Sequence, residues 1–302
     1  MELFTERHGM RKPVNKTSIM TEDMYKLIFN CCEKYYEHLS HLFPEGCPDW
    51  PSTCCGLDRD AFLMHMKFRI PNLFGGVIDQ YALLDLVEYI AKNCRDFRNL
   101  DWHGFFGHHH IEHLETNEIF GQFQKEINDI FELTGLLFVL TDTESVERVI
   151  DEGVLTPTTI EAIEIFTEKG VRELLNDALY HYKQPHPSSR KTACEKIWGA
   201  FERIKTYYTD RNKKLSGEEV VKKISDNRQE FVELFDAEFK VLTEMGNKFD
   251  VRHKETNTIE IVNPLHHDYF FNRCLSLIML VINTLGVEVV EEQQFEDDDL
   301  PF

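Results

Sequence analysis

The chain has 302 residues, of which 42% are hydrophobic and 28% are charged, and its formal net charge is −20. This composition is typical of a globular protein with a sizeable core, and it excludes a chain that is disordered throughout. The acidic excess argues against general affinity for nucleic acid, because like charges repel. The longest apolar run, 274–285, is too short to span a bilayer, and the N-terminal segment lacks the apolar stretch of a signal peptide. We therefore expect a cytoplasmic protein that does not contact membranes.

The eight cysteines are expected to be reduced thiols, because nothing in the sequence marks the chain for secretion. Two adjacent pairs, Cys31–Cys32 and Cys54–Cys55, occur on either side of Cys47, and this grouping raises the possibility of a zinc site. However, no C-x-x-C motif occurs, and the spacing fits no common zinc finger. The cysteines therefore give no prediction of a metal ligand or a cofactor.

The first half of the chain reads as helices interrupted by loops. A capping pattern at Thr21 precedes apolar residues at helical spacing, and a loop with three prolines and two glycines follows at 44–58. Apolar periodicity predicts helices over 60–67 and 77–93. The only clear strand signal is LLFVL (136–140) followed by VERVI (146–150), which predicts a β-hairpin closed by the TDTES loop.

The second half contains longer helical patterns. Helices are predicted from Pro157 to 169, over 170–182, over 192–208, over 218–245, and from Pro264 past Leu285. QPHPSSR (184–190) reads as a linker, 210–217 as a turn, and Gly246 as the stop of the preceding helix. The resulting prediction is a mainly α protein with two helical domains. The N-terminal domain covers 1–183 and contains the hairpin near 136–150, a helical bundle covers 184–290, and an acidic tail covers 291–302.

The stretch GNKFDVRHKET (246–256) is the strongest candidate for chemistry, because it places Arg252 beside His253. Metal-independent RNA cleavage activates the ribose 2′-OH against its own phosphate, and it requires a proton acceptor, a proton donor and a cation. Histidine titrates near neutral pH, and arginine binds phosphate through a planar fork. The segment from Lys183 to Lys254 also holds 16 basic and 12 acidic residues, a balance of +4, whereas the rest of the chain carries −24.

Adjacent residues on a helix point about 100° apart, so Arg252 and His253 need an irregular backbone to face one phosphate. Alternatively, two subunits could pair this corner across a two-fold axis. A purely structural interpretation is also open, in which Arg252 pairs with a carboxylate and His253 caps a carbonyl group.

Two other stretches contain chemically active residue types. Arg98, Asn99 and His103 form a reserve catalytic site, since four residues separate this arginine from the histidine and the first of them is the polar Asn99. The run HGFFGHHHIEHLE (103–115) is the densest histidine cluster, and His109 and His113 would share one face of a helix and suit a divalent metal. It contains no H-E-x-x-H motif, and a polar cluster without metal is the favoured interpretation. The phosphate-binding loop G-x-x-x-x-G-K-[ST] and the hydrolase motif G-x-S-x-G are both absent from the sequence.

Several stretches resemble abortive-infection proteins of the AbiJ-like type. In the C-terminal part these are KIWGAFERIKTYY (196–208), GNKFDVRHKE (246–255) and HDYFFNRCLSLIMLVINTLG (267–286). In the N-terminal part, LFTERHG (3–9), ALLDLVEYIAK (82–92) and the hairpin at 136–150 are similar to the AbiJ N-terminal domain. The C-terminal bundle resembles the HEPN superfamily, whose members are often dimeric ribonucleases of bacterial conflict systems.

This resemblance implies a ribonuclease effector of phage defence that acts as a homodimer on RNA, with tRNA as a candidate substrate, without a metal or other cofactor. A phage-derived trigger or an antitoxin would be its regulatory partner. Asn247 and His253 match the Asn and His of the HEPN pattern, but Gly246 stands where that pattern has arginine, so Arg252 would have to supply the guanidinium. Lys248 and Lys254 would bind substrate. The alternatives are a non-catalytic sensor or partner-binding protein of a defence or toxin–antitoxin system, and an RNA-binding regulator that does not cleave.

Overall fold

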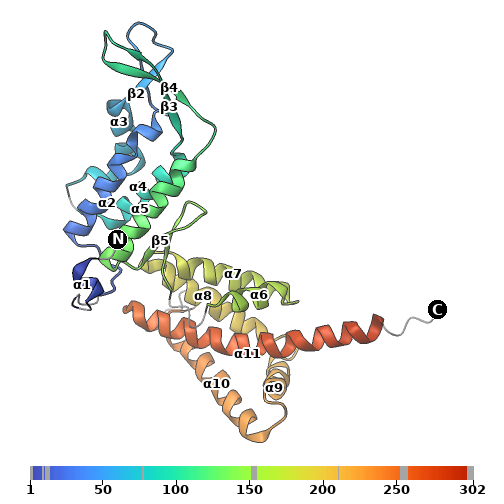
Figure 1. Cartoon of the computed structure of the whole chain (residues 1–302). Helices are drawn as coiled ribbons and strands as arrows, with labels where there is room; N and C mark the ends of the chain where they lie inside the picture. Colours follow the sequence, from blue (N-terminus) through green and yellow to red (C-terminus); the bar gives the residue numbers. More distant parts are fainter. Residues whose placement is uncertain are drawn as a thin grey trace. The chain divides into compact units, whose positions relative to one another are not determined.

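The computed structural model describes residues 3–8, 10, 14–76, 78–150, 155–209, 211–251 and 258–297, with the backbone alone at Glu6 and 286–297. The chain is mainly helical with small antiparallel strand pairs, so the predicted fold class is confirmed at that level (Figure 1). It divides into two compact units, Met1–Val149 and Ile150–Phe302.

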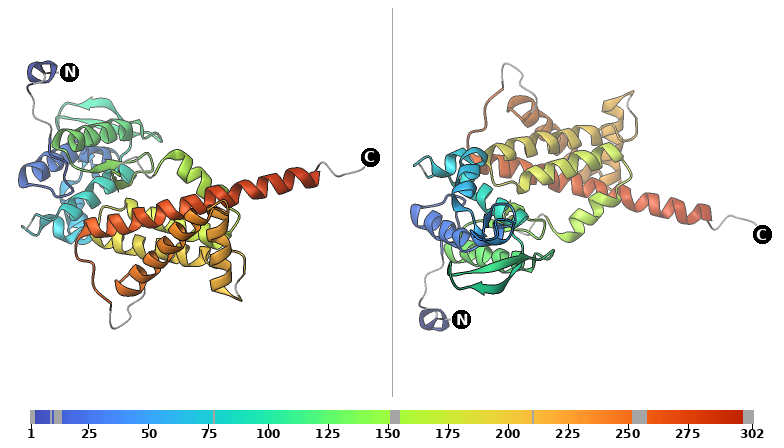
Figure 2. Two further views of the ribbon diagram at one scale, coloured as in Figure 1. Left: turned by 90° about the horizontal axis from the view of Figure 1, so that it is seen from below. Right: turned by 90° about the horizontal axis from the view of Figure 1, so that it is seen from above.

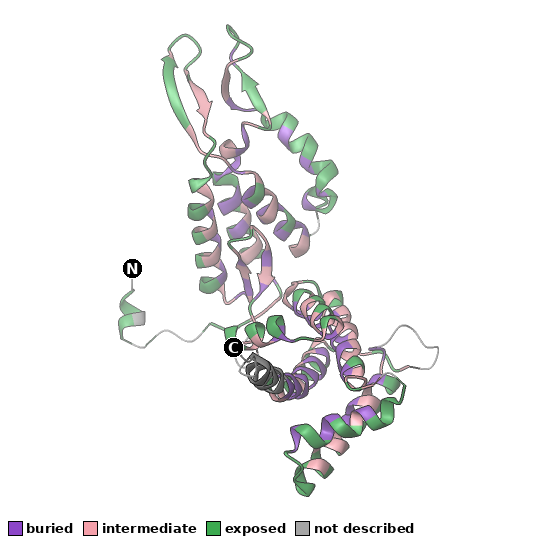
Figure 3. Cartoon of the chain, turned by 90° about the vertical axis from the view of Figure 1, so that its right-hand side faces the viewer, coloured by how far each residue is buried: buried purple, intermediate pink, exposed green. Residues whose placement is uncertain are grey.

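Three amphipathic helices form the core of the first unit. They are α2 (Glu22–Lys34), α4 (Gln80–Asn93) and α5 (Glu118–Thr134). The side chains of Thr21 and Asp79 cap the first two helices by accepting backbone N–H groups. The apolar faces of all three helices are buried together, whereas their outer faces are exposed (Figure 3). Smaller elements complete the unit: α1 (Phe4–Arg7), α3 (Arg59–Arg69) and the short 3₁₀ helices η1 (Tyr36–Leu39) and η2 (Pro71–Phe74).

Three antiparallel strand pairs belong to the same unit. The pairs are β1 (Pro44–Gly46) with β2 (Cys54–Leu57), β3 (Phe97–His103) with β4 (His108–His113), and β5 (Phe138–Leu140) with β6 (Val146–Arg148). The last pair confirms the predicted hairpin. The β3–β4 hairpin was not predicted, because five of the seven residues of β3 are exposed and give no apolar alternation. Gly107, at a φ of +69°, supplies the left-handed residue of its turn.

The second unit consists of helices. They are α6 (Pro157–Ile165), α7 (Lys169–Lys183), α8 (Pro187–Ile204), α9 (Lys213–Ile224), α10 (Gln229–Lys248) and α11 (Pro264–Asp297), the long helix that stands out in both views of Figure 2. Helices α7 and α8 pack along each other, and α11 packs against α8. The stretch predicted as a linker at 184–190 is therefore a short turn plus the start of α8, inside one unit, and the units divide at 149/150 instead of 183/184.

Several helix boundaries differ from the predictions, and two of the differences bear on the candidate site. The single helix predicted over 218–245 is two helices, because Asp226 and Asn227 adopt φ values of 48° and 56° and turn the chain between α9 and α10. Gly246 does not stop α10 but lies inside its last turn, buried against the indole of Trp198. Among the described helices, none has both the length and the apolar character needed to cross a membrane.

Candidate functional sites

The corner between α10 and α11 is the site that the sequence predicted. On leaving α10 the chain pairs with itself: the Asp250 N–H donates to the Ile259 carbonyl at 3.1 Å, and the Ile259 N–H donates to the Lys248 carbonyl at 2.9 Å. This pairing fixes the two ends of the intervening segment beside each other. The predicted site residues Arg252, His253 and Lys254 lie outside the described residues.

Asn247 and Lys248 occupy the last turn of α10, and both are exposed to solvent. The Lys248 ammonium lies 5.9 Å from the centre of the Phe249 ring, which is within the range of a cation–π contact. Among the described residues, no carboxylate forms an ion pair with Lys248. The structure therefore places one polar side chain and one cation on the solvent side of the corner, as a substrate-binding role requires.

A pocket of about 460 Å³ is lined by Met245 and Phe249 at the end of α10, by residues 259–263 and by the start of α11. Phe249 and Phe270 contribute apolar walls, and His266 and Tyr269 lie at its exposed edge. Tyr269 is 59% exposed, its hydroxyl accepts a hydrogen bond from Arg273 at 3.2 Å, and the Arg273 guanidinium lies 5.9 Å from the centre of its ring. Aromatic rings beside a cation are the usual means of holding an unstacked nucleic-acid base and its phosphate. The sequence analysis missed His266 and Tyr269, because the helical pattern gives no sign of which outward side chains border a pocket.

Gly246 is the position where the resembled HEPN pattern has arginine. A Cβ atom built on Gly246 would lie only 1.7 Å from the Nε1 atom of Trp198. Any side chain at this position must displace the indole or the backbone of α10. In this fold, position 246 therefore contributes close helix packing, and a guanidinium for the corner must come from another residue.

Charged groups tie the corner to α8. The Lys191 ammonium pairs with the carboxylate of Asp250, which also accepts the Ile261 N–H at 3.0 Å. Burial alone would raise the pKa of Asp250, but the hydrogen bonds from Lys191 and Ile261 together lower it. Arg190 lies 3.4 Å from Asp268 in a second, mostly buried ion pair. These contacts hold Asp250, Ile261 and Asp268 on the helix bundle.

His267 is a further titratable group under the corner that the sequence analysis did not single out. Its side chain is buried, and its Nε2 atom has no hydrogen-bond partner. Burial lowers the pKa of His267, although the nearby carboxylates of Asp250 and Asp268 oppose this effect. The imidazole is therefore held in its neutral form against the underside of the site, without access to substrate.

The reserve catalytic residues do not share a site. Arg98 and His103 stand near opposite ends of β3, and five residues of extended chain span roughly 17 Å. Arg98 forms an exposed ion pair with Glu112 across the hairpin. Asn99 is exposed beside it, and His103 turns into a different cluster. Arg98 and His103 therefore cannot hold one phosphate between them.

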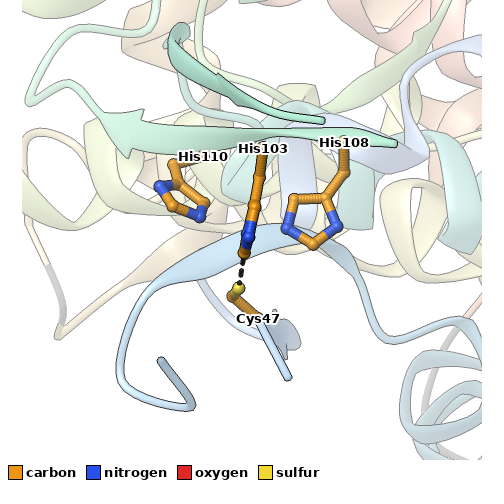
Figure 4. A group of neighbouring side chains, drawn as sticks. All are labelled: Cys47, His103, His108 and His110. Carbon is orange, nitrogen blue, oxygen red and sulfur yellow. Dashed lines mark hydrogen bonds between the residues drawn. The ribbon is translucent and has the colours of Figure 1, made fainter. Parts of the chain in front are cut away.

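Four side chains from the β1–β2 and β3–β4 regions form a candidate metal-ligand cluster. Figure 4 shows the Cys47 thiol and the rings of His103, His108 and His110 turned toward one another. One potential ligand atom from each side chain lies within 4.8 Å of all the others.

His109 and His113, which the sequence analysis considered as a metal-binding pair and did not favour, do not share a helix face, because the segment is the strand β4. In a strand, alternate residues share a face, so His108 and His110 point together. The Nδ1 atom of His109 instead bonds the Leu100 carbonyl, and His113 bonds Ser40.

Comparison with known proteins identifies no relative: no family model matches the chain, and neither do curated proteins or solved structures. The functional assignment therefore depends on the residues and geometry described above.

Proposed function

We propose that this protein is a cytoplasmic effector of phage defence that cleaves RNA, with tRNA as a candidate substrate, at the corner between α10 and α11 and without a metal ion. The observation that supports this proposal best is the exposure of Asn247 and Lys248 in the last turn of α10, the helix whose Met245 and Phe249 line a pocket together with Tyr269. The net positive balance of the surrounding segment adds to it. The resemblance to HEPN ribonucleases supplies the expected type of reaction.

In the proposed reaction, His253 removes the proton from a ribose 2′-OH, and the resulting alkoxide attacks the adjacent phosphorus. The bond to the 5′ oxygen of the next nucleotide breaks, and that oxygen takes up the proton that the His253 imidazole has accepted. Arg252 neutralises the charge that develops on the non-bridging oxygens. The products are a 2′,3′-cyclic phosphate and a 5′-hydroxyl, and no oxidant, reductant or metal is consumed.

The exposed residues of the corner are assigned to substrate binding. Lys248 and Lys254 hold flanking phosphates, and Asn247 orients the reacting nucleotide by hydrogen bonds. The ring of Tyr269 stacks on a base, which gives affinity without strict sequence preference. A homodimer that pairs two corners across a two-fold axis lets one subunit supply Arg252 and the other supply His253 to a shared phosphate.

The proposal is tested with purified protein, tRNA and total RNA in the presence of a chelator. We expect fragments ending in 2′,3′-cyclic phosphate from the wild type, and at least about 100-fold less cleavage from His253→Ala, as for loss of a general acid–base group. Lys248→Ala should weaken RNA binding, whereas Lys240→Ala serves as a matched control, because Lys240 is an exposed lysine of the same helix paired with Asp236. If the wild type and His253→Ala leave RNA equally intact, including in phage-infected cells, the ribonuclease assignment fails.

A partner-binding sensor is the second candidate function, and exposed aromatic residues favour it. Trp50, Trp102, Phe105 and Phe106 lie in or beside the turns of the β1–β2 and β3–β4 hairpins, and Phe105 is 86% exposed. Exposed aromatic clusters of this kind mark protein-interaction sites. We expect Phe105→Ser to leave thermal stability and RNA cleavage unchanged but to abolish phage protection if the sensor function is correct. Retained protection would contradict it.

A further inference from the structure

The cluster of Cys47, His103, His108 and His110 brings together one thiol and three imidazoles that are distant in the sequence. Cys47 follows β1, His103 ends β3, and His108 and His110 occupy alternate positions of β4. His103 and His108 face each other as register partners across the hairpin. The Sγ atom of Cys47 lies 3.4 Å from the Nδ1 atom of His103.

These separations are close to those of a tetrahedral metal site. Zinc–sulfur and zinc–nitrogen bonds of 2.3 and 2.0–2.1 Å place ligand atoms about 3.3–3.6 Å apart. The four ligand atoms here lie within 4.8 Å of one another, and one pair is already at 3.4 Å. Small rotations of the side chains therefore complete the coordination, with no change in the path of the backbone.

Two of the imidazoles carry buried nitrogen atoms that lack a partner. The Nε2 atoms of His108 and His110 are buried without any hydrogen bond. Figure 4 shows nitrogen atoms of both rings directed toward His103 and Cys47. A buried polar atom without a partner costs about 1–3 kcal/mol in a folded protein. A coordinated cation removes that cost, because each nitrogen then donates its lone pair to the metal.

The surroundings of His103 match the outer shell of a metal centre. Its Nδ1 atom faces the thiol of Cys47, whereas its Nε2 atom lies 3.4 Å from the Asp49 carboxylate. A metal-bound histidine commonly donates its second ring N–H to a carboxylate, which fixes the tautomer and orients the ring. The Trp50 ring packs on His103 and His110 at centroid distances of 5.1 and 5.5 Å and limits their rotation.

The backbone around Cys47 is also fixed before any metal binds. The Cys47 N–H donates to the Thr53 carbonyl at 2.9 Å, and the Cys47 carbonyl accepts the Trp50 N–H at 3.1 Å. On the other side, Gly107 closes the turn between His103 and His108. The ligands thus come from two tight turns, which hold them in place at low entropic cost.

We propose that Cys47, His103, His108 and His110 bind a single zinc ion that joins the two hairpins. The donor set decides the metal, since a thiolate with imidazoles suits Zn²⁺ and not the oxygen-seeking Mg²⁺ or Ca²⁺. Four protein ligands fill a tetrahedral shell and leave no position for water or substrate, so the ion is structural. The β3–β4 hairpin has little apolar core of its own, since five of the seven β3 residues are exposed. The zinc ion holds the hairpins together in place of such a core.

The first test measures metal in the intact chain purified without chelators. We expect one zinc ion per chain by elemental analysis, and loss of that zinc in Cys47→Ser and His110→Asn. His109→Asn and Cys55→Ser are the matched controls, because His109 is the intervening, exposed residue of β4 and Cys55 bonds the Glu45 carbonyl outside the cluster. Asp49→Asn should retain the zinc but weaken its affinity roughly 10- to 100-fold.

A second measurement identifies the ligands even if a variant folds poorly. The metal is removed from the wild type with a chelator, and Co²⁺ is added. A tetrahedral cobalt spectrum with a thiolate-to-cobalt charge-transfer band supports the site, and only the cluster variants should lose it. If the wild type contains no stoichiometric zinc and gives no such cobalt spectrum, or if the controls lose metal as readily as Cys47→Ser, the proposal is overturned.

Discussion

Replacing Gly246 with alanine tests the packing that separates this corner from the resembled ribonuclease pattern. In the interior of a helix, glycine to alanine usually stabilises a protein by roughly 0.5–1 kcal/mol, because the unfolded chain loses freedom. At Gly246 the added methyl group would lie 1.7 Å from the Trp198 Nε1 atom and 2.3 Å from its Cε2 atom. Real Cβ contacts never come this close, so the indole or α10 must move.

Overpacking of a well-packed site costs about 1–3 kcal/mol, and the overlap with a rigid indole places Gly246 toward the upper end of that range. Subtracting the helix gain leaves a net loss of about 2 kcal/mol in the free energy of unfolding. Gly217 is the matched control, because it lies inside α9 and a Cβ atom there meets nothing within 4 Å. Gly217→Ala should therefore stabilise the protein by roughly 0.5–1 kcal/mol.

Both variants are compared with the wild type by thermal and urea unfolding, followed by far-ultraviolet circular dichroism. A gap of about 2.5–3 kcal/mol between them corresponds to roughly 5–12 °C in melting temperature for a unit of this size. If Gly246→Ala is as stable as Gly217→Ala, the close approach of Trp198 does not limit position 246, and the reasoning that excludes an arginine there fails.

Three further outcomes are expected from single contacts. Lowering the pH from about 7.5 to about 5.5 should destabilise the protein, because burial lowers the pKa of His267 from its usual 6.5 and the unfolded chain then binds more protons than the folded one. The loss of stability begins near pH 6.5 and ends below the lowered pKa of His267. In melting curves of His267→Gln, the loss should be smaller. Asp250→Asn should cost about 1–3 kcal/mol in urea unfolding, because the partly buried Lys191 loses its charged partner. Arg98→Ala should leave RNA cleavage unchanged. It should change the free energy of unfolding by only about 0–1 kcal/mol, because the ion pair between Arg98 and Glu112 is exposed. A larger loss of cleavage or of stability would contradict the conclusion that Arg98 and His103 do not form a catalytic site.

The helices were largely predictable from the sequence because their apolar residues recur with the helical period. The prediction of a helix over 77–93 corresponds to α4 at Gln80–Asn93, where Asp79 supplies the cap. The single helix predicted over 218–245 was wrong, because periodicity continues across a break that depends on two left-handed residues, Asp226 and Asn227. Such residues tolerate that conformation without requiring it, so a sequence pattern alone does not reveal the turn.

The β3–β4 hairpin shows a different limit. Its strands carry polar and aromatic residues without apolar alternation, and they are held by pairing with each other and by contacts between β4 and the neighbouring strand β2. Reading 103–115 as a helix selected His109 and His113, whereas a strand selects His108 and His110. The choice of period therefore determined which imidazoles were assigned to a metal.

Cys47 could not have been identified from spacing, because it precedes His103 by more than fifty residues and belongs to no metal-binding motif. It joins the cluster only because the β1–β2 turn lies beside the β3–β4 turn, a tertiary contact between hairpins. The other thiols near it form local bonds instead: Cys54 donates to the Gly56 carbonyl and Cys55 to the Glu45 carbonyl. Only one of the eight cysteines belongs to the cluster, and the run of neighbouring histidines does not show which of them face Cys47.

The two proposed sites require different chemistry. A shell of one thiolate and three imidazoles leaves no open coordination position, so zinc in the first unit cannot activate water or polarise a phosphate. The corner of the second unit relies on proton transfer and a fixed cation, which work without metal. In these two proposals, the zinc ion holds the hairpins and their exposed aromatic residues, such as Phe105, in place, and the exposed Asn247 and Lys248 bind the RNA substrate. Because the two sites belong to separate compact units, loss of either one should leave the core of the other unit intact.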